Sequence, residues 1–136
     1  MIKFGPSGNP DQFYDDGFKA STSMPLWVKN QGLDAYEYQC GNGVRCGEAT
    51  AKKIAEKAQE HGIIMSVHSP YYINLATPEE EKRAGNINYI LQSAQLVKYL
   101  GGDRAYMRGR ICLTRALADS NGIKRNKVYA GYKKRA

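Results

Sequence analysis

The fold is decided by the stretch IIMSVHSPYYINL, residues 63–75, which lies between two helical patterns. Residues 63–67 are almost entirely apolar, as expected of a central parallel strand that is buried on both faces. His68 follows this predicted strand directly and precedes an aromatic loop. A metal-capable imidazole at the carboxyl end of a strand, between helices, occupies the position where α/β enzymes hold their chemistry.

The helix before this strand is predicted over residues 48–61. Its apolar residues recur at helical spacing, its other face is charged, and Gly62 provides a stop. His61 is predicted to be a polar cap or cation at the helix end. The apolar positions are Ala51, Ile54, Ala55 and Ala58.

The helix after the strand is predicted to begin at Thr77-Pro78-Glu79-Glu80, where Thr77 and Glu80 fit a capping box and Pro78 fits the first helical position. Gly101 and Gly102 end it. We expect its buried stripe to consist of Ile87, Ile90, Leu91, Ala94, Val97 and Leu100.

Three further strands and one short helix complete the pattern. Residues 2–5 and 34–38 read as strands, residues 103–107 could start a fourth strand, and residues 23–31 read as a helix. Strands separated by helices imply parallel pairing with right-handed crossovers. The sequence therefore predicts an α/β fold with about three and a half βα units.

The length allows one domain with its own core. The first residues lack the apolar core of a signal peptide, and no apolar run reaches the ~18–20 residues of a membrane span, so we expect a cytoplasmic protein. Cys40, Cys46 and Cys112 are then expected to be reduced thiols. The spacing of Cys40 and Cys46 is not that of a structural zinc site.

The net charge of +7 is concentrated at one end of the chain. Residues 1–104 carry 11 Lys or Arg and 12 Asp or Glu, whereas residues 105–136 carry 9 Lys or Arg and only Asp119. We therefore place a boundary near residue 104 and regard residues 105–136 as a basic tail. Such a tail can bind phosphates without sequence specificity.

Several segments together carry a family likeness. They are MIKFGPSG at 1–8, GLDAYEYQC at 32–40, HSPYYINLA at 68–76, EEEKR at 79–83 and LGGDR at 100–104. In these segments the chain resembles the endonuclease IV branch of the xylose isomerase-like barrels, zinc-dependent enzymes that cleave DNA 5′ to abasic sites. The resemblance covers residues 1–104. It implies the N-terminal part of a (β/α)8 TIM barrel, a fold that needs about 250 residues when complete.

The resemblance also implies a site. In that family three zinc ions are held by His, Asp and Glu side chains, and His68 matches the ligand after the third strand. Tyr71 matches an aromatic side chain that contacts abasic DNA, and Arg45 is a weaker match to a basic side chain of the preceding loop. From the residues alone, Tyr71 and Tyr72 could instead cover apolar surface, and Arg45 could be an ordinary solvated cation.

The pattern changes after residue 104. Family members continue there into a strand that ends in a second metal-binding histidine, whereas this chain reads AYMRGR at 105–110. His61 and His68 are its only histidines. Our hypothesis is that a truncation or frameshift interrupts an endonuclease IV-like sequence. We expect the isolated chain to be aggregation-prone and to lack abasic-site nuclease activity.

Two other functions stay open at this point. The chain could be a fragment of a sugar isomerase or epimerase built on the same barrel. It could also be a non-enzymatic protein that binds nucleic acid through residues 105–136. That function predicts binding that weakens steeply with salt and ignores abasic sites.

Overall fold

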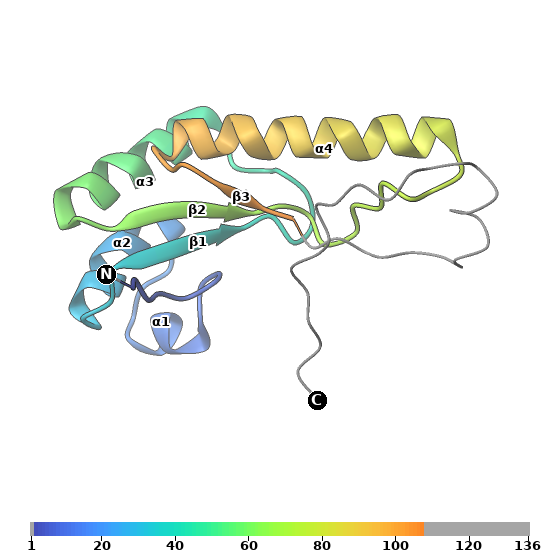
Figure 1. Ribbon diagram of the computed structural model, residues 1–136. Coiled ribbons are helices and arrows are strands. Elements are labelled where there is room, and N and C mark those ends of the chain that lie inside the picture. Colours follow the sequence, from blue (N-terminus) through green and yellow to red (C-terminus); the bar gives the residue numbers. More distant parts are fainter. Residues whose placement is uncertain (1, 108–136) are drawn as a thin grey trace.

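The computed structural model describes residues 2–107, and Figure 1 shows how their helices and strands alternate. The basic tail predicted from residue 105 lies outside the described residues except for its first three. The elements are α1 (Asp11–Asp15), the 3-10 helix η1 (Ser21–Ser23), α2 (Met24–Asn30), β1 (Ala35–Gln39), α3 (Glu48–His61), β2 (Ile64–His68), α4 (Glu80–Tyr99) and β3 (Ala105–Tyr106).

The three strands form one parallel sheet in the order β1-β2-β3. Gln39 at the end of β1 lies opposite His68 at the end of β2, which in turn lies opposite Tyr106 in β3. The carboxyl ends of the three strands therefore meet at one edge. The predicted α/β class and parallel pairing are confirmed.

The N-terminal segment runs beside β1 without forming a regular strand. The Phe4 carbonyl accepts hydrogen bonds from the backbone N–H groups of Asp34 and Ala35, and Ser7 forms a single parallel bridge to Glu37. The strand predicted over residues 2–5 is thus extended and hydrogen-bonded but irregular. Gly5 permits this contact, because a Cβ there would lie 1.6 Å from the Ala35 carbonyl oxygen.

The core lies between the helices and one face of the sheet (Figure 1). Tyr36 of β1 and Met65 and Val67 of β2 point to this face and are buried. Alternate residues of a strand point to opposite faces, so Ile64, Ser66 and His68 point away from the core. From the helices, the core takes Phe13, Met24, Trp27, Val28, Ala51, Ile54, Ala58, Leu96 and Val97.

One prediction about β2 is wrong for the described residues. The strand was expected to be buried on both faces, but Ile64 is 46% exposed. The reason is that only one face of the sheet in residues 2–107 is part of the core. Below, "open face" means the other face, which carries Glu37, Gln39, Ile64, Ser66 and His68.

Helix α3 matches its prediction. Ala51, Ile54 and Ala58 are buried, and Gly62 ends the helix in the left-handed region with φ of 68°. That conformation is costly for any residue with a Cβ, which explains why glycine stands at this position.

Helix α4 departs from its prediction at both its start and its buried face. It begins at Glu80, and no side chain caps it, so the predicted capping box is wrong. Thr77 is buried before the helix, where its carbonyl accepts a hydrogen bond of 3.1 Å from the Arg83 guanidinium.

The buried face of α4 is confined to its last two turns. Ser93, Leu96 and Val97 are buried there, and Leu100 follows them. Ile87 and Leu91 were predicted to be buried but are 47% and 63% exposed. Figure 1 explains the difference, because the N-terminal half of α4 extends past the sheet.

Among the helices of residues 2–107, none combines the length and apolar character that crossing a bilayer requires.

Gly102 lies shortly before β3, and a substitution there tests its close approach to β2. A Cβ at Gly102 would lie 2.5 Å from the Met65 carbonyl oxygen, closer than real Cβ contacts. We expect Gly102→Ala to lower the free energy of unfolding by about 1–3 kcal/mol, because the backbone must shift. A Cβ at Gly41 meets nothing within 4 Å, so Gly41→Ala should stay within ~0.5 kcal/mol. Denaturant unfolding of both variants checks this, and equal stabilities would contradict it.

Candidate metal and DNA-binding edge

His68 is fixed at the carboxyl edge of the sheet. Its Nδ1 lies 2.7 Å from the Ser69 carbonyl oxygen, and its own carbonyl accepts the Cys40 N–H at 2.9 Å. A carbonyl oxygen only accepts hydrogen bonds, so Nδ1 carries the proton and the lone pair resides on Nε2. The ring is half-buried, and its centroid lies 5.2 Å from that of Tyr106. The imidazole is thus oriented with Nε2 able to accept a metal ion or a proton.

Polar side chains of β1 share the open face with His68. The Glu37 carboxylate accepts a short hydrogen bond from the Ser7 hydroxyl. The Gln39 amide donates to the Ser7 hydroxyl at 3.0 Å and to the Ser7 carbonyl at 3.3 Å. The sequence reasoning missed Glu37 and Gln39 as site residues. The available signal was their spacing of two positions, since Glu37 lies in the strand predicted over residues 34–38 and Gln39 follows it directly, which places both on one face.

Two loops meet beside this edge. The first follows β1 and contains Gly43 and Arg45, and the second follows β2 and contains Tyr71 and Tyr72. A Cβ built at Gly43 would lie 3.4 Å from the Tyr72 hydroxyl, so the loops touch. Partial burial and the neighbouring Tyr89 raise the pKa of Tyr72, and the positive charge of Arg45 opposes that rise.

The structure therefore brings the predicted DNA-contacting residues together. Arg45 is exposed, Tyr71 is 52% exposed, and the rings of Tyr71 and Tyr72 lie 5.6 Å apart at 75°. Below, "loop rim" means Arg45, Tyr71 and Tyr72. Their part in binding DNA stays a prediction.

Comparison with known proteins adds the family. The model of the xylose isomerase-like TIM barrel family matches residues 25–132, most of the chain. The chain belongs to this family. The predicted fold class, a partial TIM barrel, is confirmed. The match to the xylose isomerase-like barrels continues past residue 104, through most of the segment that we regarded as a tail, and the boundary at 104 stays a prediction.

Two individual proteins are similar to this member of the family. The uncharacterized protein MJ0133 of Methanocaldococcus jannaschii is 32% identical over 126 residues, which cover 93% of this chain and 44% of that protein. The crystal structure of D-psicose 3-epimerase in the presence of D-fructose superposes with a TM-score of 0.64 at 16% identity, covering 89% of this chain and 45% of the epimerase. The chain spans less than half the length of both.

Family membership explains why the polar residues gather where they do. In TIM barrels the active site lies at the carboxyl ends of the strands, and side chains of alternate strand positions fill the barrel interior. The open face of β1 and β2 corresponds to that interior. His68, Gln39 and Tyr106 thus form one row at the carboxyl ends of the strands, the end at which TIM barrels carry their active sites.

The described residues do not complete a zinc site. Catalytic zinc takes about three protein ligands. Within residues 2–107 no group of three or more His, Cys, Asp or Glu side chains is arranged to hold a metal ion. Glu37 is engaged by Ser7, and burial raises the pKa of the Cys40 thiol to about 11, which keeps it protonated at neutral pH. His68 is therefore a single candidate ligand.

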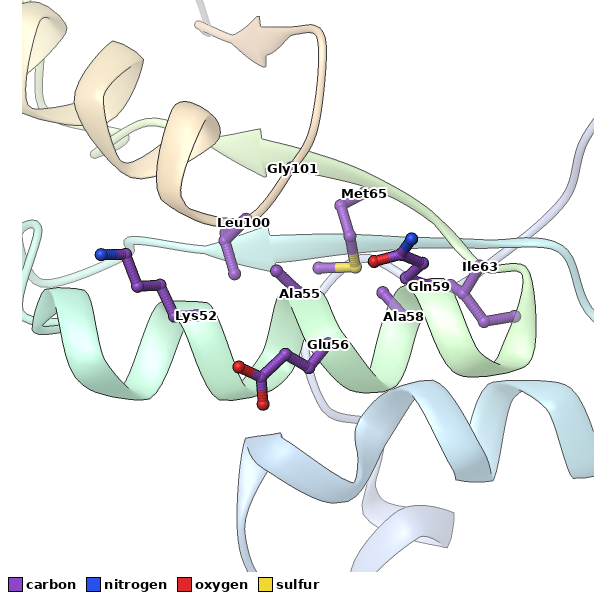
Figure 2. Close-up of a pocket in the computed structure, with 9 residues that line it drawn as sticks. All are labelled: Lys52, Ala55, Glu56, Ala58, Gln59, Ile63, Met65, Leu100 and Gly101. Atoms are coloured by element: carbon purple, nitrogen blue, oxygen red, sulfur yellow. The ribbon is translucent and has the colours of Figure 1, made fainter.

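A cavity of about 450 Å³ lies at the opposite end of the sheet. Figure 2 shows it against α3, with Met65 near the start of β2 and Leu100 after the end of α4 on its other side. Since these residues belong to the amino-terminal end of the barrel, this cavity is separate from the edge that carries His68.

Proposed function

We propose that this chain is the N-terminal part of a zinc-dependent endonuclease that cleaves DNA 5′ to abasic sites, as endonuclease IV does. The observation that carries the proposal is a juxtaposition at one edge of the sheet. An imidazole with an available Nε2 lies beside two neighbouring loops that present the Arg45 guanidinium and the exposed ring of Tyr71. We further propose that His68 is one zinc ligand, completed by side chains outside residues 2–107.

The environment of His68 suits that role. Metal-binding histidines usually donate their second ring N–H to a carbonyl or carboxylate, which fixes the tautomer and the ring direction. The Ser69 carbonyl does this for His68. A zinc ion held there would polarise the phosphodiester and lower the pKa of its bound water. What this chain contributes is the orientation of one ligand.

The loop rim suits a damaged duplex. Arginine binds phosphates, and aromatic side chains can occupy the space next to a missing base or stack on its neighbours. Arg45 and Tyr71 come from different loops, so a duplex lying across the edge would meet both. The two loops lie close enough for this, since a Cβ built at Gly43 would lie 3.4 Å from the Tyr72 hydroxyl.

DNA binding tests this proposal directly. We expect the chain to bind a labelled duplex with one stable abasic analogue more tightly than the same duplex without it, as measured by fluorescence anisotropy. Tyr71→Ala should remove most of that preference, about tenfold. Arg45→Ala should weaken binding to both duplexes and reduce the salt slope by about one.

The matched control is Lys29→Ala, which removes an exposed cation from the last turn of α2. The end of α2 precedes β1, so Lys29 lies at the amino-terminal end of the sheet, away from the loop rim. Equal affinity for the two duplexes, or an equal effect of Lys29→Ala and Arg45→Ala, would contradict the proposal.

A sugar isomerase or epimerase is the second candidate. The likeness to D-psicose 3-epimerase favours it, although at 16% identity that likeness concerns the fold. This function predicts that D-fructose binds at the open face and that the abasic analogue gives no preference. The two candidates therefore differ in a single pair of titrations.

A further inference from the structure

A second cavity, separate from the row of His68, lies between the loop after β2 and the N-terminal half of α4. Its volume is about 380 Å³, within the ~300–1,000 Å³ range of small-molecule sites. The residues that matter below are Tyr72, Asn74, Lys82, Gly85, Asn86 and Tyr89, all of which line it.

The walls of this cavity are fixed by direct contacts. The rings of Tyr72 and Tyr89 meet edge to face, with centroids 5.2 Å apart at 82°. The Asn86 side-chain amide donates to the Asn74 carbonyl at 2.7 Å. The Asn74 side-chain oxygen accepts from the Ala76 N–H at 3.1 Å, which turns the loop. Loop and helix therefore hold the cavity between them.

Gly85 indicates that the space is kept open. It lies in the interior of α4, where glycine costs about 0.5–1 kcal/mol relative to alanine. Its φ is not positive, and a Cβ there would meet nothing within 4 Å. Neither a turn nor close packing in the described residues requires glycine at this position. The absence of a side chain leaves room in the cavity.

The chemistry of the lining fits a nucleobase. Aromatic rings offer surfaces for a planar heterocycle, and the Asn86 carboxamide, whose nitrogen donates one N–H to the Asn74 carbonyl, has its oxygen and its second N–H to offer to a base edge. The Lys82 ammonium is exposed at the cavity, where its pairing with Glu79 at 2.7 Å is open to competition by a phosphate. Tyr72 belongs to this wall and to the loop rim, so the cavity adjoins the proposed DNA surface.

We propose that the cavity between the loop after β2 and α4 binds an unpaired nucleobase of the DNA substrate, with Asn86 reading the base edge and Lys82 contacting the adjoining phosphate. The proposal rests on the proposed function for its substrate. It adds a base-binding subsite formed by Tyr72, Tyr89, Asn74 and Asn86, outside the row of His68.

The test uses mononucleotides and the full chain. Deoxyadenosine 5′-monophosphate is titrated and followed by saturation-transfer NMR, with 2-deoxyribose 5-phosphate and D-fructose as compounds that lack the base. We expect the nucleotide to bind and the two other compounds to show no saturable binding. Gly85→Leu should weaken nucleotide binding at least tenfold by filling the cavity, and Asn86→Ala should weaken it about tenfold.

The matched control is Ala84→Leu, which places the same side chain at the neighbouring exposed position of α4, outside the cavity lining. It should leave binding unchanged. Helicity by circular dichroism checks that Gly85→Leu folds. If Gly85→Leu does not fold, the effect of Asn86→Ala on nucleotide binding tests the proposal. Nucleotide binding that withstands both variants would overturn the proposal, as would equal binding of deoxyribose phosphate or D-fructose.

Failure of the proposed function gives a different pattern. If the nucleotide binds and Gly85→Leu abolishes binding, the subsite stands even where the duplex titrations show no preference for the abasic analogue. If the abasic preference is present but no nucleotide binds, the subsite is wrong and the proposed function stands.

Discussion

Replacing Ile64 by lysine is expected to reduce self-association of the purified chain about tenfold, measured as the concentration at which light scattering detects larger species. Ile64 is 46% exposed on the open face, and Tyr106 on β3 is 48% exposed. Burying an isoleucine is worth about 1.5–3 kcal/mol, and 1.4 kcal/mol corresponds to tenfold in an association constant. A lysine at position 64 would place a positive charge in any contact that buries the open face against a second chain, which disfavours association.

The parallel edge strands add to this tendency. Within residues 2–107, β3 has no partner on its far side, and unpaired backbone groups of an edge strand invite pairing with another chain. Leu91→Lys is the matched control, since Leu91 is 63% exposed on α4, away from the open face. A monomeric unsubstituted chain, or an equal effect of Leu91→Lys, would contradict this expectation.

The chain supplied with zinc is expected to leave an abasic duplex intact. Of its two histidines, His61 lies at the end of α3, near the start of β2, and His68 lies at the carboxyl edge. Within residues 2–107 no three His, Cys, Asp or Glu side chains are arranged to hold a metal ion, and the sequence beyond residue 107 contains neither histidine nor glutamate. Three ligands are needed for a catalytic zinc ion, so the rate should not exceed that of the duplex with zinc alone.

Denaturing electrophoresis of an end-labelled duplex measures this, because a nick shortens the labelled strand. Zinc-dependent nicking that disappears in His68→Ala would show that this chain is active by itself. That outcome would contradict the expectation that the site is incomplete, although it would leave the proposed substrate in place.

The sequence predicted the elements around His68 well because they depend on local signals. The apolar run of residues 63–67 and the glycine at 62 specify a strand and a helix end by short-range physics, and the structure has both. The position of His68 at the carboxyl edge follows from them. The closeness of the loops that contain Arg45 and Tyr72 could not be predicted from local signals, because it depends on how two loops fold against each other.

The wrong predictions about α4 concern features that depend on tertiary packing and not on local signals. Helical spacing identifies an apolar face but not what covers it, and Ile87 and Leu91 lie where α4 extends past the sheet. Thr77 and Glu80 have the composition of a capping box, yet the Arg83 contact to the Thr77 carbonyl and the later helix start override it. Glu37 was not predicted because it lies inside β1 and not at its end, and Gln39 was not predicted because a carboxamide at a strand end is not a usual zinc ligand.

The measurement that tests the account most directly is to sequence the gene from the codon of Gly101 to several hundred bases past that of Ala136. We expect the DNA to continue as an open reading frame, in the same or a shifted frame, that encodes further His, Asp and Glu residues at the ends of predicted strands. Its joined product should nick abasic duplexes with zinc and lose that activity in His68→Ala. A continuation without such ligands, or a joined product that converts D-fructose and ignores abasic DNA, would contradict the account.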